Sequence, residues 1–146
     1  MTKTAHQIVR DFFAAMSSGT LSADMLTDDM TAWTTSSGVH VPRDRYVGGS
    51  KMLQTIFDGG IHYTVDSITA EDDRAAAEVR AQGKLINGED YANTYVFMFR
   101  IRDGKIASLA EHFNPDPMRS QLGPLIQQVM AKTTGTTTGT TTGGEK

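Results

Sequence analysis

The sequence predicts an α+β fold: a cone-shaped half-barrel in which a curved antiparallel sheet wraps around a pocket and the N-terminal helices pack on the sheet. Apolar residues recur at helical spacing in two segments before residue 58, and four strand-like runs follow between residues 61 and 113. Asn87-Gly88 and Asp103-Gly104 lie between such runs, and these dipeptides favour hairpin turns because their residues accept positive φ angles. Helices followed by a meander indicate helices on one face of a sheet, and strong twist lets that sheet curl around a cavity.

The first half of the chain carries the predicted helices. Residues 4–16 form an amphipathic helix with Ile8, Phe12 and Met16 on one stripe, and Ser17-Ser18-Gly19 ends it. The other elements expected here are a short helix over 21–26, a strand over 30–35, a loop over 38–45 and a helix from Gly49 to Phe57 that Gly59-Gly60 ends.

The second half carries the predicted sheet. Its strands are expected over residues 61–70, 74–86, 91–102 and 105–113. Pro115 and Pro117 end the sheet because proline cannot donate to a ladder. A last helix is expected over 118–132, interrupted at Gly123-Pro124. We therefore expect one domain over residues 1–132 and a disordered Thr/Gly tail over 133–146.

Composition excludes several kinds of partner. The net charge is −3 and the Lys and Arg residues are scattered, so nucleic acid is not expected as a partner. The chain has no cysteine, which excludes disulfides and zinc-thiolate sites, and no apolar run approaches the roughly 20 residues of a membrane span. The four histidines lack the close spacing of a metal site, so we expect no metal. We also expect no other cofactor, no membrane partner and a cytoplasmic location.

The last strand carries the sharpest chemical signal, Glu111. Side chains alternate along a strand, so Leu109, Glu111 and Phe113 share one face. A carboxylate between two apolar neighbours loses hydration, which raises its pKa and makes it a candidate acid or base near neutrality. The strand alone equally allows a solvated Glu111 with His112 facing inward.

An aromatic set on the neighbouring strand predicts the wall of the pocket. The residues of one face are Tyr91, Asn93, Tyr95, Phe97, Phe99 and Ile101. Asn93 is then an amide within an aromatic wall that needs hydrogen-bond partners, or an amide at a strand end that a neighbouring turn satisfies. The residues expected to bind a substrate are Trp33, Tyr95, Phe97, Phe99 and His62, and for His62 a surface or internally satisfied histidine is the favoured alternative.

Two charged residues of the strand 74–86 have two interpretations. Glu78 and Arg80 alternate with small apolar residues, and this pattern alone places them in water. If the sheet instead turns this face inward, Glu78, Arg80 and Glu111 form a charge-paired cluster in which the arginine keeps one carboxylate ionised.

From about Ala5 to Pro117 the chain resembles the SnoaL-like polyketide cyclase group of the nuclear transport factor two-like superfamily. The stretch that carries the resemblance runs from Tyr91 through Asp103-Gly104 to Ile106 and ends in Glu111-His112-Phe113-Asn114-Pro115, while the stretch from Leu26 to Trp33 adds a weaker match. These motifs are specific for the fold more than for the reaction, because the fold hosts isomerases, cyclases, epoxide hydrolases, dehydratases and binders.

The resemblance implies roles for individual positions. Glu111 falls where SnoaL-like cyclases and related epoxide hydrolases carry a catalytic aspartate. The hydrolases' Arg and Asp fall at Glu78 and Arg80, in reversed charge order, and their Tyr and Asn fall at Ala32 and Thr34, which puts epoxide hydrolysis in doubt. The acids of ketosteroid isomerases fall at Phe97 and near Thr34, so that machinery is missing.

These observations predict that the protein binds a small molecule and is an acid–base enzyme of the cyclase, isomerase or hydrolase type. Glu111 is the expected general base for a small apolar carbonyl-containing substrate, and Asn93, Tyr95 or Arg80 is expected to steady the oxyanion. The alternative is a non-catalytic ligand-binding or dimerisation module in which Glu111 pairs with Arg80. The resemblance also implies a homodimer through the exposed face of the sheet.

Overall fold

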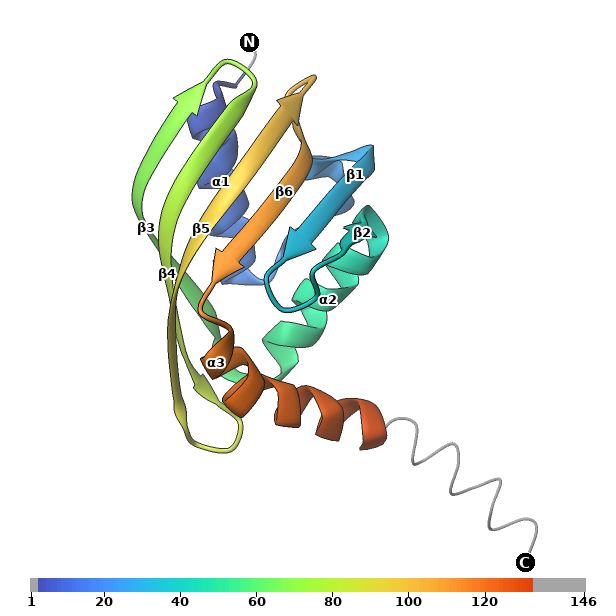
Figure 1. Ribbon diagram of the computed structural model, residues 1–146, viewed down its shortest axis with the longest axis vertical. Coiled ribbons are helices and arrows are strands. Elements are labelled where there is room, and N and C mark those ends of the chain that lie inside the picture. Colours follow the sequence, from blue (N-terminus) through green and yellow to red (C-terminus); the bar gives the residue numbers. More distant parts are fainter. Residues whose placement is uncertain (1–2, 133–146) are drawn as a thin grey trace, which may run out of the picture.

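A six-stranded sheet in the order β2–β1–β6–β5–β4–β3 forms the body of the molecule (Figure 1). The computed structural model describes residues 3–132 of the 146-residue chain. The strands are β1 (Leu26–Thr34), β2 (His40–Pro42), β3 (Phe57–Glu71), β4 (Arg74–Leu85), β5 (Asp90–Arg102) and β6 (Lys105–Phe113). The sheet curves around helix α1, and the fold class that the sequence predicts is confirmed.

Strands β3 to β6 form the predicted antiparallel meander. Both predicted hairpin turns are present, with Gly88 at φ 91°, Asp103 at φ 54° and Gly104 at φ 75°. The prediction of a purely antiparallel sheet is wrong at one place, since β1 pairs with β6 in parallel. Parallel neighbours need a long crossover, and here α2 and the strands β2 to β5 provide it.

Helix α1 (Ala5–Ser18) packs on the concave face of the sheet (Figure 1). Thr4 and Gln7 form a capping box at its start, and Gly19 ends it in the left-handed conformation at φ 72°. The rings of Phe12 and Phe13 meet those of the sheet edge to face, with 4.8 Å between the centroids of Phe13 and Phe97. These contacts pack α1 against β5.

Several boundaries between residues 21 and 61 differ from the prediction. The expected helix over 21–26 is a single 3-10 turn, η1 (Ala23–Met25), because buried Leu26 already belongs to β1. The expected loop contains β2. Helix α2 (Arg43–Thr55) begins directly after Pro42 and six residues before the expected start at Gly49. Figure 1 shows α2 beside β1 and β2.

Gly59 and Gly60 do not end a helix but form an irregularity within β3. Both have φ 83°, and the pairing of β3 with β4 shifts register between Asp58 and His62. The backbone between those two positions is therefore not held by regular ladder partners.

The C-terminal helical segment closes one end of the molecule (Figure 1). It begins with α3 (Pro115–Pro117), continues through a π-helical turn, η2 (Met118–Leu122), and is α-helical over residues 123–132. The break expected at Gly123-Pro124 takes the form of this wider turn, because Pro124 has no amide hydrogen and its ring displaces the carbonyl four residues earlier. Leu122 and Leu125 are buried in the core. The tail expected to be disordered, residues 133–146, lies outside the described residues.

The two faces of the sheet differ in character. The aromatic set predicted for the concave side is buried at Tyr91, Asn93, Tyr95, Phe97 and Phe99. On the other face, Val96 and Met98 expose 39% and 47% of their surface. None of the helices within residues 3–132 has the length and apolar character of a membrane span.

Candidate functional site

Glu111 is the centre of the candidate site. It lies on β6 with its side chain on the concave face, opposite Phe97 of β5 and Thr34 of β1. The Tyr46 hydroxyl, which α2 brings to this face, donates a hydrogen bond of 2.6 Å to Oε2 of Glu111. Burial disfavours the carboxylate and raises the pKa of Glu111 to about 7, although the bond from Tyr46 opposes this rise. The group can therefore both take up and release a proton near neutral pH.

The four tyrosines of the chain surround this carboxyl. Each of Tyr46, Tyr63, Tyr91 and Tyr95 interacts electrostatically with Glu111. Burial is the largest cause that raises the pKa of each phenol above its usual value, and at Tyr91 the hydrogen bonds with Tyr95 and Asn93 oppose this rise. All four hydroxyls thus stay protonated near neutral pH.

Two of these hydroxyls are already engaged with each other. The oxygens of Tyr91 and Tyr95 lie 2.8 Å apart. The side-chain amide of Asn93 donates to Tyr91 at 3.1 Å and to the backbone carbonyl of Asn114 at 3.0 Å. The amide predicted to steady an oxyanion is therefore held by a neighbouring side chain and by the turn after β6.

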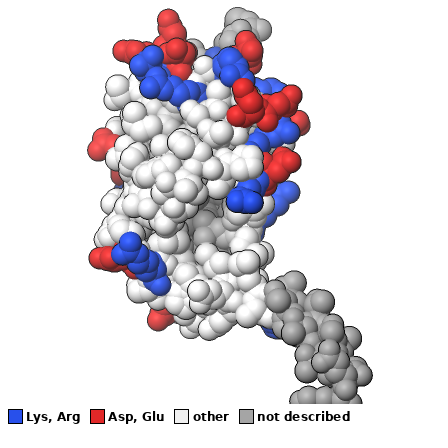
Figure 2. Space-filling model, turned by 45° about the vertical axis from the view of Figure 1, so that its right-hand side comes forward, with Lys and Arg blue, Asp and Glu red and all other residues white. Residues whose placement is uncertain are grey.

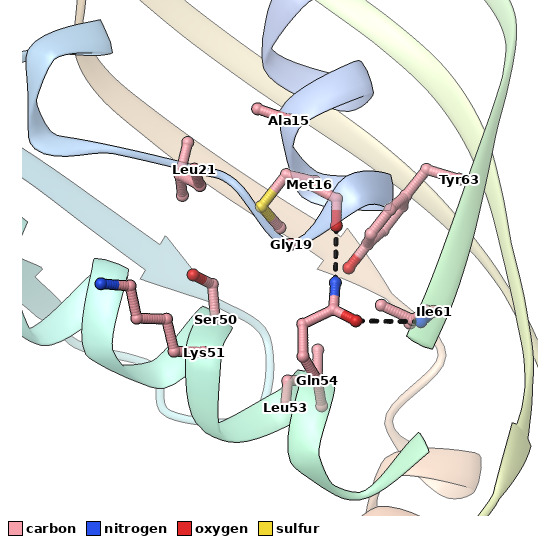
Figure 3. A pocket seen from close by; sticks show the side chains of 10 residues that line it. All are labelled: Ala15, Met16, Gly19, Leu21, Ser50, Lys51, Leu53, Gln54, Ile61 and Tyr63. Atoms are coloured by element: carbon pink, nitrogen blue, oxygen red, sulfur yellow. Dashed lines mark hydrogen bonds between the residues drawn. The ribbon is translucent and has the colours of Figure 1, made fainter. Parts of the chain in front are cut away.

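Tyr63 is different, because no group within residues 3–132 hydrogen-bonds its hydroxyl. Its backbone amide donates to Ser17 Oγ at 2.9 Å, which ties β3 to the end of α1. The side chain lines a cavity of about 10 Å³ between α1 and α2 (Figure 3). That volume is close to what one water molecule occupies.

The structure brings some of the predicted site residues together. Asn93, Tyr95, Phe97 and Phe99 all share the concave side with Glu111. Phe97 and Phe99 are sealed beneath Phe12 and Phe13, so they form core rather than an open wall.

The predicted cluster of Glu78, Arg80 and Glu111 does not form. Arg80 makes two hydrogen bonds of 2.9 Å to Asp66 of β3, on the exposed face. Glu78 accepts a hydrogen bond of 2.6 Å from Ser67. Strand alternation explains this placement, because the buried Val79 and Ala81 take the inward positions of β4. The ion pair between Glu111 and Arg80 is absent for the same reason.

Trp33 and His62 also lie on the exposed side of their strands. Trp33 packs on His112 with ring centroids 4.9 Å apart, while its neighbour Ala32 is fully buried. His62 is exposed between Ile61 and Tyr63, which face the core. The prediction that Trp33 and His62 line the pocket is therefore wrong.

Sequence reasoning missed Tyr46 and Tyr63. Tyr46, Ser50 and Leu53 recur at helical spacing, but the helix was expected to begin only at Gly49. Tyr63 follows Ile61 by two residues, and this alternation marks it as inward-facing once β3 is known. Within residues 3–132, no group of three or more His, Asp or Glu side chains is placed to hold a metal ion.

Comparison with known proteins gives the family. The sequence profile of the SnoaL-like domain family matches residues 9–109, which is more than half of the chain. No functionally curated protein matches significantly.

Solved structures share the fold. An NTF2-like protein from Anabaena variabilis is 28% identical over 75% of this chain and 86% of its own, with a TM-score of 0.67. IdmH, a candidate polyketide cyclase from Streptomyces antibioticus, is 22% identical over 81% of this chain and 97% of its own, with a TM-score of 0.69. A ketosteroid isomerase-like protein from Catenulispora acidiphila, solved with trimethylamine, is 18% identical over 75% of this chain and 85% of its own, with a TM-score of 0.64. The chain belongs to the SnoaL-like domain family and has its NTF2-like fold.

Proposed function

We propose that this protein is an acid–base enzyme of the cyclase, isomerase or hydrolase type that acts on a small, largely apolar molecule bearing a carbonyl group. The observation that carries the proposal is the Glu111 carboxyl, whose pKa burial raises to about 7 and which Tyr46 holds from α2. A base of this kind is half ionised at neutral pH, where proton transfer is most effective. The chemistry requires no cofactor.

The same geometry suggests a division of labour. Glu111 takes a proton from the carbon next to the carbonyl, and the electron pair of that bond passes to the carbonyl oxygen. The Tyr63 hydroxyl, which has no partner among the described residues, is the donor available to this oxygen. Tyr63 thus takes the role predicted for Asn93, Tyr95 or Arg80, whose polar groups are engaged elsewhere.

Related structures support a small-molecule role. The Catenulispora protein holds trimethylamine, and IdmH is a candidate polyketide cyclase. At these identities the likeness concerns the fold, so the substrate class proposed here rests on the lining of the site itself.

A second candidate is a non-catalytic ligand-binding or dimerisation module. The packing of Phe12 and Phe13 on the concave face favours it, because the cavity beside Tyr63 measures only about 10 Å³. A catalytic role therefore requires that the site open.

Hydrogen exchange of small ketones separates the two candidates. Purified protein is incubated with cyclohexanone in deuterated water, and loss of the proton next to the carbonyl is followed by NMR. The enzyme predicts exchange above buffer that Glu111→Gln abolishes, whereas the matched variant Glu78→Gln, on the opposite face, keeps it. Equal exchange in wild type and Glu111→Gln would contradict the proposal, and bound ketone without exchange would favour the module.

We also propose a homodimer through the exposed face of the sheet. Figure 2 shows an uncharged, hollowed area below a charged end of the molecule. A groove of about 440 Å³ crosses the exposed face, with Ala76, Met98 and Ala110 in its floor and the charges Arg74, Arg100 and Glu71 at its rim. Charges of both signs at an apolar groove suit a second copy, because a two-fold axis places opposite charges together. The chain has no cysteine, which suits the reducing cytoplasm that we propose as its location.

A further inference from the structure

The side chain of Gln54 ties three elements together at the seam between α1 and α2 (Figure 3). From the last turn of α2, its amide nitrogen donates to the carbonyl oxygen of Met16 in α1 at 2.6 Å. Its amide oxygen accepts from the backbone nitrogen of Ile61 in β3 at 3.2 Å. One side chain therefore spans the gap that separates the two helices from the edge strand.

The bond from the Tyr63 amide to Ser17 Oγ, two residues after Ile61, is a second side-chain contact that holds β3 to the end of α1. Ile61 lies inside the irregularity of β3, where the register with β4 shifts between Asp58 and His62, so Gln54 replaces a ladder partner. A Cβ atom on the neighbouring Gly60 would approach Oε1 of Gln54 within 2.8 Å. Glycine at position 60 leaves room for the Gln54 amide in its present position.

The contact lies over the interior of the site. Gln54, Met16 and Ile61 line the cavity of about 10 Å³ together with Tyr63. In Figure 3 the Tyr63 side chain points toward the Gln54 amide. Ser50, which also lines the cavity, lies one turn of α2 after Tyr46, and the Tyr46 hydroxyl donates to Glu111, so the cavity lies near the proposed catalytic group.

The opposite end of the molecule is closed by the C-terminal helical segment (Figure 1). Leu122 and Leu125 of the C-terminal helical segment are buried in the core. Gln121 from the same segment donates to the backbone oxygen of Asp90 at 3.0 Å. Opening that end would expose Leu122 and Leu125. Opening the seam breaks the two hydrogen bonds of Gln54 and the bond from the Tyr63 amide to Ser17, and it uncovers part of Met16 and Ile61.

We propose that the seam between α1 and α2 is the ligand entrance of the Glu111 site and that the Gln54 side chain is the clasp that closes it. This inference rests on the proposed function only for what happens after entry. The ligand is a small molecule with an apolar body and one acceptor oxygen, because the lining is apolar at Ala15, Leu21 and Leu53 and includes the donors Tyr63 and Lys51.

Carbodiimide labelling of Glu111 measures the entrance without any assay of turnover. A water-soluble carbodiimide with glycine ethyl ester modifies protonated carboxyls near neutral pH, and mass spectrometry of the peptides locates the product. Glu111 is half protonated there, while exposed Glu78 serves as an internal reference for reagent quality. In Gln54→Ala we expect labelling of Glu111 to accelerate roughly fivefold or more relative to wild type, because two hydrogen bonds no longer oppose opening.

Three further variants make the result decisive. Gln54→Leu keeps the size of the side chain without its hydrogen bonds and replaces the alanine variant if that one unfolds. Gln121→Ala removes the matching glutamine at the opposite end and should leave the labelling rate of Glu111 unchanged. Glu111→Gln should remove the label, which identifies its site.

Unchanged labelling of Glu111 in both Gln54 variants would contradict the proposal that the seam is the ligand entrance. Equal acceleration of labelling in Gln121→Ala would contradict it as well. Accelerated labelling in the Gln54 variants together with no ketone exchange in wild type would uphold the entrance and reject the catalytic proposal. The two ideas therefore fail separately.

Discussion

Glu111 binds its proton more tightly in the folded protein than in the unfolded chain, and this makes stability depend on pH. Its pKa rises from 4.5 to about 7 on folding, so its stabilising contribution is complete below about 4.5 and disappears as the pH rises through 7. We expect the free energy of unfolding to fall by on the order of 2 kcal/mol across this window, measured by urea unfolding. The arginine partners of Asp29 and Asp66 lower the pKa values of these carboxyls, so they affect the pH dependence of stability only at lower pH.

Glu111→Gln should remove this fall, while Glu78→Gln should retain it because Glu78 is exposed on the opposite face. Curves of stability against pH that run parallel in wild type and Glu111→Gln would show that Glu111 is hydrated in solution.

Tyr46 tunes the same carboxyl. Its hydrogen bond of 2.6 Å stabilises the ionised form, so Tyr46→Phe should raise the pKa of Glu111 above the wild-type value and lower stability by about 1 kcal/mol. Carbon-13 NMR of labelled glutamate side chains measures the titration directly. Tyr91→Phe is the control, since the Tyr91 hydroxyl bonds Tyr95 and Asn93 rather than Glu111. A larger shift of the Glu111 pKa in Tyr91→Phe than in Tyr46→Phe would mean that burial, and not the hydrogen bond from Tyr46, sets this pKa.

At the scale of residues, strand alternation was a good guide and helix orientation was not. The inward direction of Glu111 and Asn93 follows from a period of two that burial enforces. Trp33 shows the limit, because alternation separates it from Ala32 but does not say which of the two is inside. Tyr46 could not be assigned because the rotation of α2 about its axis is set by contacts with β1 and β3.

At the scale of elements, two glycines with different surroundings should respond in opposite directions. A Cβ atom at Gly83 of β4 would lie 2.5 Å from the ring of buried Phe57, whereas nothing lies within 4 Å of one at Gly48 in α2. We expect Gly83→Ala to destabilise by about 1–3 kcal/mol and Gly48→Ala to stabilise by about 0.5–1 kcal/mol. Thermal unfolding monitored by circular dichroism tests both, and stabilisation by Gly83→Ala would contradict the packing of Phe57.

The C-terminal helical segment should behave as part of the domain. Leu122 is fully buried, so Leu122→Ala should lower the free energy of unfolding by about 2–5 kcal/mol. Met130, which is 55% exposed on the same segment, provides the matched control, and Met130→Ala should change stability by less than about 0.5 kcal/mol. Urea unfolding measures both. Similar values for the two variants would mean that the segment is detached in solution.

Local signals recovered elements whose turns are chemically distinctive. The hairpins at Asn87-Gly88 and Asp103-Gly104 were predicted because positive φ angles select these residues. Strand β2 was missed because three residues carry too little periodicity to detect. The parallel pairing of β1 with β6 was missed because no local pattern encodes which distant strand becomes a neighbour.

At the scale of the whole molecule, the exposed sheet face should hold two copies together. Met98 lies in the groove of this face and is 47% exposed, so Met98→Lys should convert the dimer to a monomer without loss of folding. Sedimentation velocity at micromolar concentration measures the change. Val39→Lys alters an equally exposed residue outside the groove and should leave the mass unchanged. A wild-type monomer at these concentrations would reject the dimer.

The pairing of β1 with β6 also sets an order of events during synthesis. Ala32 and Leu109 are neighbours in the sheet, yet the ribosome makes the first long before the second. While translation continues, the inner edge of β1 has no native strand beside it, and α1 has no complete sheet to cover. The nascent chain must therefore keep its N-terminal third from premature association until β6 emerges. The parallel pairing of β1 with β6 then completes the sheet.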